Sequence, residues 1–288
     1  MAPLSIEILG SGGAVRTPRP GCQCERCTSA RTIGIPWARM GPSVFVHGPN
    51  VLIDTPEDSC TQVDRAGITT IAAGLYSHWH PDHTAGRRMW ETRNGDFLHW
   101  PSRPTTTPIY VPPNAARDFR ERGIWESFEF KQKMGYVTVQ EMSGPLELGG
   151  WRITAHSVAE DYVYAFLFEE MDGPRRVLIC MDELHGWMPP EHLRHVDLVV
   201  LPKGLFDMHP FTGERIIPAD HPVLRSEATY VQTLEMVRTL AARKVIFMHL
   251  EEPEPFTPPE YAALAAHLRA QEGWDVTFAW DTLVVELP

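Results

Sequence analysis

Residues 78–83 read His78-Trp79-His80-Pro81-Asp82-His83 and place four metal-ligand side chains within six positions. Directly before them, residues 71–77 form an apolar run typical of a buried strand. A strand that ends in such a loop presents imidazoles and a carboxylate at the rim of a sheet, where a substrate can reach them. Neutral imidazole and carboxylate suit Zn, Fe or Mn rather than an ion that prefers thiolates. The stretch therefore predicts an ordered metal site rather than a surface turn that contains histidines by chance.

Three further ligand-type residues follow later predicted strands. Taken singly, each would be an ordinary residue at the end of a strand. Together with residues 78–83 they predict a two-metal site, because sites built on sheets tend to form at the carboxyl ends of strands. These residues are His156 after the strand 151–155, Asp182 after the run 176–181 and His249 after the run 244–248.

The motif at 78–83 resembles the dinuclear signature of the metallo-β-lactamase superfamily, and the later residues occur in the order that this family requires. The resemblance implies two bound divalent transition metals, with Asp54, after the strand 51–53, orienting the histidine loop. Two cations about 3.5–4 Å apart can activate a shared water and clamp the oxygens of a phosphoryl or carbonyl centre. The sequence leaves the metal open among Zn, Mn and Fe. The family's ligand sets correspond here to His78, His80 and His156 for one metal, Asp82, His83 and His249 for the other, and Asp182 as the bridge.

A cysteine cluster lies in the Pro/Gly-rich loop at 21–27, where Cys22, Cys24 and Cys27 have C-x-C-x2-C spacing. Three thiolates this close in sequence can converge on one tetrahedral ion. Together with residues 9–14, the cluster resembles two branches of the superfamily: the phosphoribosyl 1,2-cyclic phosphate phosphodiesterases of phosphonate breakdown and pyrroloquinoline quinone biosynthesis protein B. In the phosphodiesterases a histidine completes this site, and here that position is Glu252. A structural zinc that includes Glu252 and a set of three free thiols both stay open.

The catalytic residues are less well determined. The family resemblance implies a metal-bridging hydroxide oriented by Asp82. The phosphodiesterases also place a histidine at the start of the helix before the last strand, a position that Glu227 occupies here. A carboxylate acts as a general acid only if its pKa is raised, and it repels a phosphate when it is ionised. His221, six residues earlier in a Pro-rich loop, is the alternative acid, although it would also suit a surface loop.

The arrangement of predicted elements favours an α/β fold, the αββα sandwich of the metallo-β-lactamase type, as one domain over residues 1–288. A hairpin is predicted at 43–53, where Gly48-Pro49-Asn50 separates two apolar runs. Insertions at about 87–107 and 203–225 carry several arginines, lysines and aromatic residues. They would act either as lids that shape a pocket or as solvated loops that cover the core.

Composition limits the classes of partner that this protein is expected to bind. The formal net charge of −11 and the pI near 5.6 disfavour a basic face that tracks nucleic acid. No apolar run reaches 18 residues, so no membrane span is predicted, and residues 1–6 lack the pattern of a signal peptide. We therefore expect a cytoplasmic enzyme that acts on a small, anionic substrate. A homodimer is the assembly that we consider for it.

The leading functional hypothesis is a dinuclear metal-dependent hydrolase that acts as a phosphodiesterase on a small phosphodiester, either cyclic or linear. One alternative is an iron-dependent oxidative enzyme related to pyrroloquinoline quinone biosynthesis protein B. Another is a non-catalytic metal or ligand binder, which the loss of the helix-start histidine would suit. Oxygen consumption by an iron-loaded protein would separate the oxidative enzyme from the hydrolase.

Overall fold

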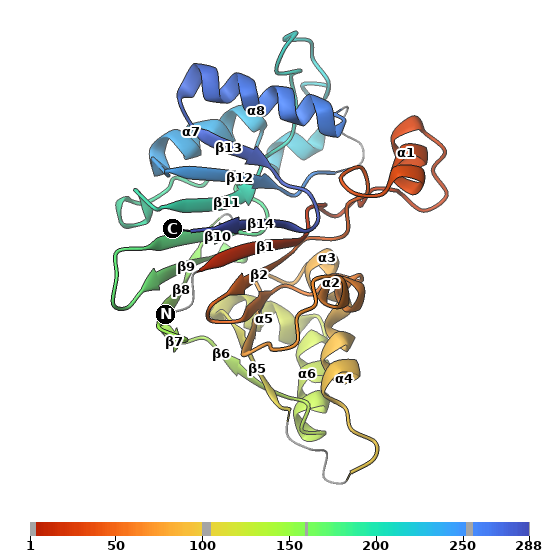
Figure 1. Cartoon of the computed structure of the whole chain (residues 1–288), viewed down its shortest axis with the longest axis vertical. Helices are drawn as coiled ribbons and strands as arrows, with labels where there is room; N and C mark the ends of the chain where they lie inside the picture. The colour runs from red at the N-terminus through yellow and green to blue at the C-terminus, as the bar shows by residue number, and fades with distance from the viewer. Residues whose placement is uncertain (1–3, 100–104, 159–160, 252–255, 288) are drawn as a thin grey trace.

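The fold is a sandwich of two seven-stranded mixed sheets with helices on both outer faces (Figure 1). The computed structural model describes residues 4–99, 105–158, 161–251 and 256–287. The first sheet has the order β14 (Leu283–Glu286), β1 (Ser5–Gly10), β2 (Ser43–His47), β3 (Val51–Ile53), β4 (Ala73–Leu75), β5 (Thr107–Val111) and β6 (Val137–Glu141). The second has the order β13 (Asp275–Phe278), β12 (Lys244–Met248), β11 (Leu198–Pro202), β10 (Arg176–Cys180), β9 (Tyr164–Glu170), β8 (Trp151–Ser157) and β7 (Leu146–Leu148).

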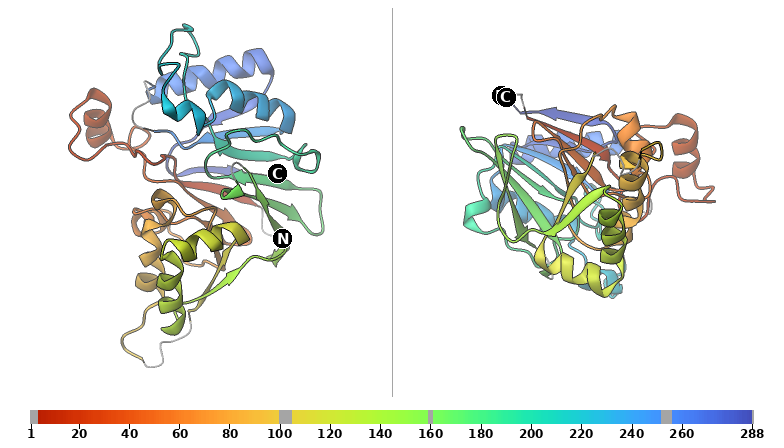
Figure 2. Two further views of the ribbon diagram at one scale, coloured as in Figure 1. Left: turned by 180° about the vertical axis from the view of Figure 1, so that it is seen from behind. Right: turned by 90° about the horizontal axis from the view of Figure 1, so that it is seen from below.

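Helices cover the two sheets separately, as Figures 1 and 2 show. Beside the first sheet lie α2 (Ser59–Arg65), α3 (Pro81–Thr84), the 3₁₀ turn η1 (Ala85–Arg88), α4 (Met89–Asn94), α5 (Pro113–Glu121) and α6 (Ile124–Lys133). The second sheet carries α7 (Tyr230–Leu240) and α8 (Pro258–Glu272), with short 3₁₀ turns η3 (Glu191–Leu193) and η4 (Pro222–Arg225) in its connections. The predicted αββα sandwich is confirmed. Helix α1 (Glu25–Ile33), next to the cysteines, projects from the side of the sandwich.

The core has three layers of apolar contacts, as this architecture requires. The middle layer joins the inner faces of the two sheets, for example Ile53 of the first and Ile179 of the second. Another layer packs β10–β13 against α7 and α8, and a third packs β1–β3, β5 and β6 against the helices of the first sheet. Strands β10 and β11 are apolar almost throughout because both of their faces are buried.

Local sequence explains several element boundaries. The predicted hairpin at 43–53 is confirmed, with β2 and β3 antiparallel and Asn50 in the left-handed region. Helix α8 begins with a capping box between Thr257 and Glu260 and ends at Gly273 in a left-handed conformation. None of the described helices combines the length and the apolar character that a membrane crossing needs.

Within the residues described, helix α4 of the insertion at 87–107 contributes to the core. Trp90 is buried on α4, and its indole N–H donates to Tyr76 Oη at 2.9 Å. Gly74 makes this packing possible, because a Cβ at that position would lie 2.7 Å from the Trp90 ring. Residues 100–104 of the insertion lie outside the described residues.

Candidate metal centre

The histidine motif follows β4 directly and turns into helix α3. Pro81 occupies the first turn of this helix, where its missing N–H has no cost, and His83 lies one residue before the helix ends. Asp182 follows β10, and His249 follows β12 with a φ of 59°. A Cβ on Gly13 would lie 2.4 Å from the His249 ring, so this glycine lets the loop after β1 approach the centre closely. Four separate strands therefore bring these residues to one place.

Asp54 organises the histidine loop from beneath. It is completely buried, has a φ of 60° and accepts hydrogen bonds from Ser77 N at 2.7 Å and Ser77 Oγ at 2.6 Å. His83 Nδ1 lies 2.7 Å from Asp54 Oδ2, and His78 Nδ1 lies 3.0 Å from Ser77 Oγ. Because a carboxylate only accepts, His83 Nδ1 carries a proton, and Nε2 is the ring nitrogen directed at the centre. Asp54 thus occupies the place expected of the orienting residue.

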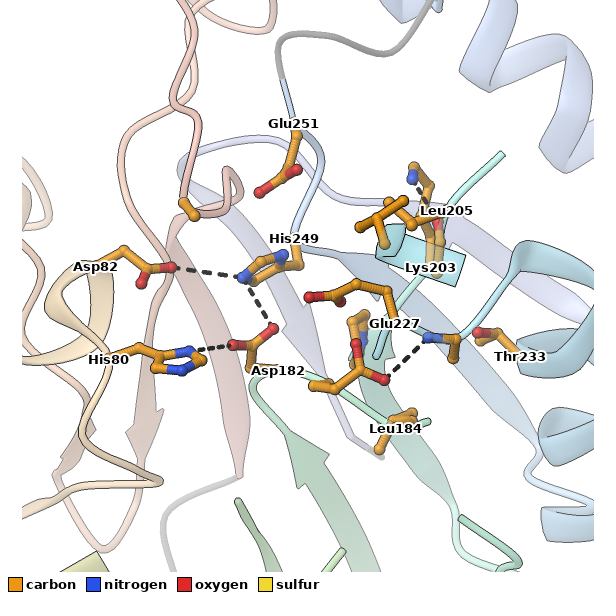
Figure 3. A pocket seen from close by; sticks show the side chains of 16 residues that line it. His80, Asp82, Asp182, Leu184, Lys203, Leu205, Glu227, Thr233, His249 and Glu251 are labelled. Atoms are coloured by element: carbon orange, nitrogen blue, oxygen red, sulfur yellow. Dashed lines mark hydrogen bonds and ion pairs between the residues drawn. The ribbon is translucent and has the colours of Figure 1, made fainter. Parts of the chain in front are cut away.

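Two overlapping groups of potential ligands meet here. His78, His83 and Asp182 offer atoms within 4.8 Å of one another, and so do Asp82, His83 and His249. Asp182 lies between the groups, since its Oδ2 is 3.1 Å from His78 Nε2 and its Oδ1 is 3.2 Å from His249 Nε2. Figure 3 shows Asp82, Asp182 and His249 facing one another around this point. This is the position expected of a bridging carboxylate.

The donor atoms of this cluster are placed to bind a cation rather than to form hydrogen bonds with one another. His78 Nε2, His83 Nε2, His249 Nε2 and Asp82 Oδ2 are buried and lack hydrogen-bond partners among the described residues. Their nitrogen–oxygen distances of 3.1–3.6 Å bring opposite charges close without hydrogen-bond geometry. Buried polar atoms are normally satisfied, so these point to a group that takes several lone pairs at once. The residues present fit divalent metal ions.

Electrostatics in the cluster favour ionised carboxylates. Burial would raise the pKa of Asp82 and of Asp182, but the neighbouring histidines outweigh it and hold both pKa values well below the usual range. Burial lowers the pKa of His78 to about 4. It also opposes charge on His249, yet Asp182 and Asp82 outweigh it and raise that pKa to about 9. Both aspartates are therefore negative at neutral pH, as ligands of a cation must be.

His80 and His156 lie outside the two tight groups formed by the described residues. His80 Nδ1 is 3.5 Å from Asp182 Oδ2, and its ring is 4.4 Å from that of His78. His156, on β8, has Nδ1 3.4 Å from His192 Nε2, while its own Nε2 is buried and has no partner within the described chain. Ligation by both residues remains a prediction, and the orphaned Nε2 of His156 agrees with it.

The cysteine cluster is assembled as its spacing predicts. Cys22, Cys24 and Cys27 bring their sulfurs within 4.8 Å, with Cys24 at the N-cap of α1 and Cys27 buried. Three thiols at this separation can hold one tetrahedral ion. Glu252, the expected fourth ligand, lies outside the described residues.

A cavity of about 190 Å³ opens beside the aspartates and histidines (Figure 3). Glu227 lines it, whereas His221 does not belong to its lining; the His221 ring accepts from Val223 N at 3.2 Å on the surface. The lining also includes Lys203, from the insertion at 203–225, together with Glu183 and Glu251, which the sequence did not single out. Glu183 follows Asp182 directly, and this adjacency was the available signal.

Glu183 and Glu227 form a carboxyl pair in the cavity wall. Glu183 Oε1 accepts from Ala228 N at 2.9 Å, which ties the loop after β10 to the start of α7. Burial and the hydrogen bond with Glu227 raise the pKa of Glu183 to about 10, so the pair holds a proton at neutral pH. Lys203 is 1% exposed, and its Nζ donates to Gly204 O at 2.6 Å. Among the charged side chains of the wall beyond the metal ligands, carboxyl groups therefore outnumber the one lysine.

Comparisons with known proteins agree with this architecture. The comparison with curated proteins gave no match. A crystal structure described as a new diphosphatase from the PhnP family is 24% identical and aligns over 99% of this chain and 97% of that chain, with a TM-score of 0.72. Zn²⁺-bound PqqB from Methylobacterium extorquens is 16% identical over 98% and 100% of the chains, with a TM-score of 0.65. The short form of human tRNase Z is 16% identical over 99% of each chain, with a TM-score of 0.63.

At these identities the structural likeness establishes the fold. The two branches expected from the cysteine cluster are both among the similar structures. Residues 49–250 match the family model described as the beta-lactamase superfamily domain. The match covers more than two thirds of the chain and contains every proposed ligand from His78 to His249. The protein is a member of the metallo-β-lactamase superfamily.

Proposed function

We propose that this protein is a dinuclear metal-dependent phosphohydrolase that cleaves a small phosphodiester or a related phosphate compound. The observation that carries the proposal is the convergence of orphaned histidine nitrogens and two ionised aspartates beside a cavity. The similarity to a diphosphatase of the PhnP family supports phosphate chemistry. When bound, two divalent cations would lower the pKa of a coordinated water and act as Lewis acids toward a phosphoryl oxygen.

The residues of the centre would have two roles, as metal ligands and as partners that orient those ligands. His78, His80 and His156 would hold one ion, while Asp82, His83 and His249 would hold the other, with Asp182 between them. Asp54 fixes the His83 tautomer through a 2.7 Å contact, and Ser77 sets the His78 ring through a 3.0 Å contact. These contacts prevent the two rings from turning away, which keeps Nε2 of each directed at the centre.

The other wall of the cavity would select the part of the substrate next to the phosphate. Glu183, Glu227 and Glu251 line it together with Lys203. Carboxylates repel a phosphate but accept hydrogen bonds from hydroxyl or amino groups. The substrate would therefore place its phosphoryl group among the histidines and aspartates, and a hydroxyl or amino group toward Glu227. A phosphate ester of a polyol or sugar has this arrangement.

The first experiment is elemental analysis of the purified protein together with hydrolysis of bis(p-nitrophenyl) phosphate. We expect two transition-metal ions per chain, with turnover that a chelator removes and that added Zn²⁺, Mn²⁺ or Fe²⁺ restores. His249→Ala should lower turnover by at least about a hundredfold. Mutation of a residue that only orients a metal ligand typically lowers activity about 10–100-fold, and removal of the ligand itself should lower it more. His47→Ala is the matched control, since His47 on β2 pairs with Glu7 of β1.

Two outcomes would contradict the proposal. A protein that binds no metal at the histidines would overturn it. An iron-loaded protein that consumes oxygen and hydrolyses neither phosphodiesters nor phosphoanhydrides would favour the oxidative alternative.

A further inference from the structure

A second cavity, of about 610 Å³, shares no lining residue with the cavity at the histidines. It is bounded by the segment before β2, by α8 and by the end of β13. Its volume falls in the range of pockets that hold small molecules. The lining residues are Ile35, Pro36, Arg39, Pro258, Tyr261, Ala262, Ala265, Arg269, Thr277, Phe278, Ala279 and Trp280.

Arg39 is the unusual member of this lining. Only 5% of its surface is exposed, and its guanidinium makes neither a hydrogen bond nor an ion pair with the described residues. Its Nε is completely buried without a partner. The contact recorded for the guanidinium is with the Tyr261 ring, whose centre lies 5.2 Å from Cζ. Buried charges are normally paired, so Arg39 has the surroundings of a cation that awaits an anion.

The backbone holds Arg39 firmly in this place. Arg39 N donates to Thr17 O at 2.7 Å, and Thr17 N donates to Arg39 O at 3.2 Å. These two bonds form a bridge between segments on either side of α1. The bridge therefore fixes the backbone of Arg39, whose buried side chain lines the cavity.

The charges around the cavity have one sign. Arg39 and Arg269 line it, whereas no aspartate or glutamate of the described chain does. This is notable in a protein with a formal charge of −11. Arg269 is fixed by a 2.7 Å hydrogen bond from Nη2 to Val276 O. The cavity is thus locally suited to an anion.

The remaining walls are apolar and partly aromatic. Tyr261, Ala265 and Phe278 are buried, and Trp280 is 38% exposed at the rim. Planar apolar groups can stack against such rings, and a guanidinium recognises a planar oxyanion through two parallel hydrogen bonds. We infer that this cavity binds a small molecule in which a carboxylate or similar oxyanion is attached to an aromatic or apolar body. Its anionic group faces Arg39, and its body lies against Tyr261 and Trp280.

Calorimetric titration with 2-naphthoate tests the inference, with neutral 2-naphthamide as the matched ligand. We expect saturable binding of one naphthoate per chain and at least tenfold weaker binding of the amide. Arg39→Gln should weaken naphthoate binding at least tenfold, whereas Arg152→Gln, which removes a surface arginine paired with Glu147, should not. The chelator-treated and the metal-loaded protein should bind naphthoate equally, since the site is separate from the histidines.

A second variant guards against a simple folding defect in Arg39→Gln. Ala262→Phe adds a ring at the cavity wall, leaves Arg39 in place and should also reduce binding at least tenfold without a change in melting temperature. Equal binding of naphthoate and naphthamide would overturn the inference. So would undiminished naphthoate binding by both variants, or the absence of binding together with a change in oligomeric state in Arg39→Gln, which would make this face a contact between two copies.

Discussion

The two cavities of this protein differ in how their charge is arranged. The cavity at the histidines is lined by Asp82, Asp182, Glu183, Glu227 and Glu251, with Lys203 as the basic residue. The cavity beside α8 is lined by Arg39 and Arg269 and by apolar side chains. One suits cations and hydrogen-bond donors, and the other suits an anion. The overall charge of −11 therefore describes neither cavity, because local potential depends on which charges lie nearby and how well they are buried.

The largest expected effect concerns the carboxylate between the two ligand groups. Asp182→Asn removes a negative charge that lies 3.1 Å from His78 Nε2 and 3.2 Å from His249 Nε2. We expect metal content to fall to one ion per chain or fewer, and hydrolysis to fall at least about a hundredfold. Asp172→Asn, in the exposed turn before β10, is the control. Elemental analysis of both variants measures their metal content. Full metal content in Asp182→Asn would show that Asp182 does not bridge two metal ions.

A smaller effect is expected beneath the histidines. Asp54→Asn keeps the shape of the side chain but weakens its hold on Ser77 and His83. Residues that orient metal ligands typically change metal affinity by about 10–100-fold, and we expect a loss in that range. Competition with a chromogenic chelator measures it. Asp64→Asn on the surface of α2 is the matched control, and an unchanged affinity would show that Asp54 serves the fold alone.

The carboxyl wall should affect one class of substrate more than another. Glu227→Gln should lower kcat/KM for thymidine 5′-monophosphate p-nitrophenyl ester at least about tenfold, because a hydrogen bond to a charged group contributes about 1.5–3 kcal/mol. Hydrolysis of bis(p-nitrophenyl) phosphate, which has no hydroxyl group, should change much less. Glu129→Gln on α6 is the control. Equal losses on both substrates would indicate that Glu227 acts on the phosphoryl group instead.

The smallest effect separates the cavities directly. Arg39→Gln should leave metal content unchanged and alter the hydrolysis of bis(p-nitrophenyl) phosphate by less than about twofold at about 0.1 M salt, since the α8 cavity shares no lining residue with the cavity at the histidines. Steady-state kinetics at that ionic strength provide the measurement. A larger change would mean that the α8 cavity communicates with the histidines.

Much of the candidate site could be predicted from sequence because its ligands are local or come at strand ends. Residues 78–83 lie together along the chain, so their convergence needs little tertiary information. Asp182 and His249 follow apolar runs, and strands in one sheet bring such ends together. The sequence did not decide whether His221 is an acid at the phosphate or a surface loop residue, because loop conformation carries no periodic signal. The structure places its ring on the surface.

The sequence by itself determined the family, the sandwich fold and the order of the ligand-type residues, because hydrophobic periodicity and short ligand motifs are written along the chain. Only the tertiary structure decided the contacts between distant residues. It brought Glu183 beside Glu227, set Asp54 beneath His83, and laid Arg39 against a ring of α8. Each of these contacts pairs residues far apart in sequence and leaves no local pattern. Their energies depend on burial and direction, which exist only once the two sheets and their helices have packed.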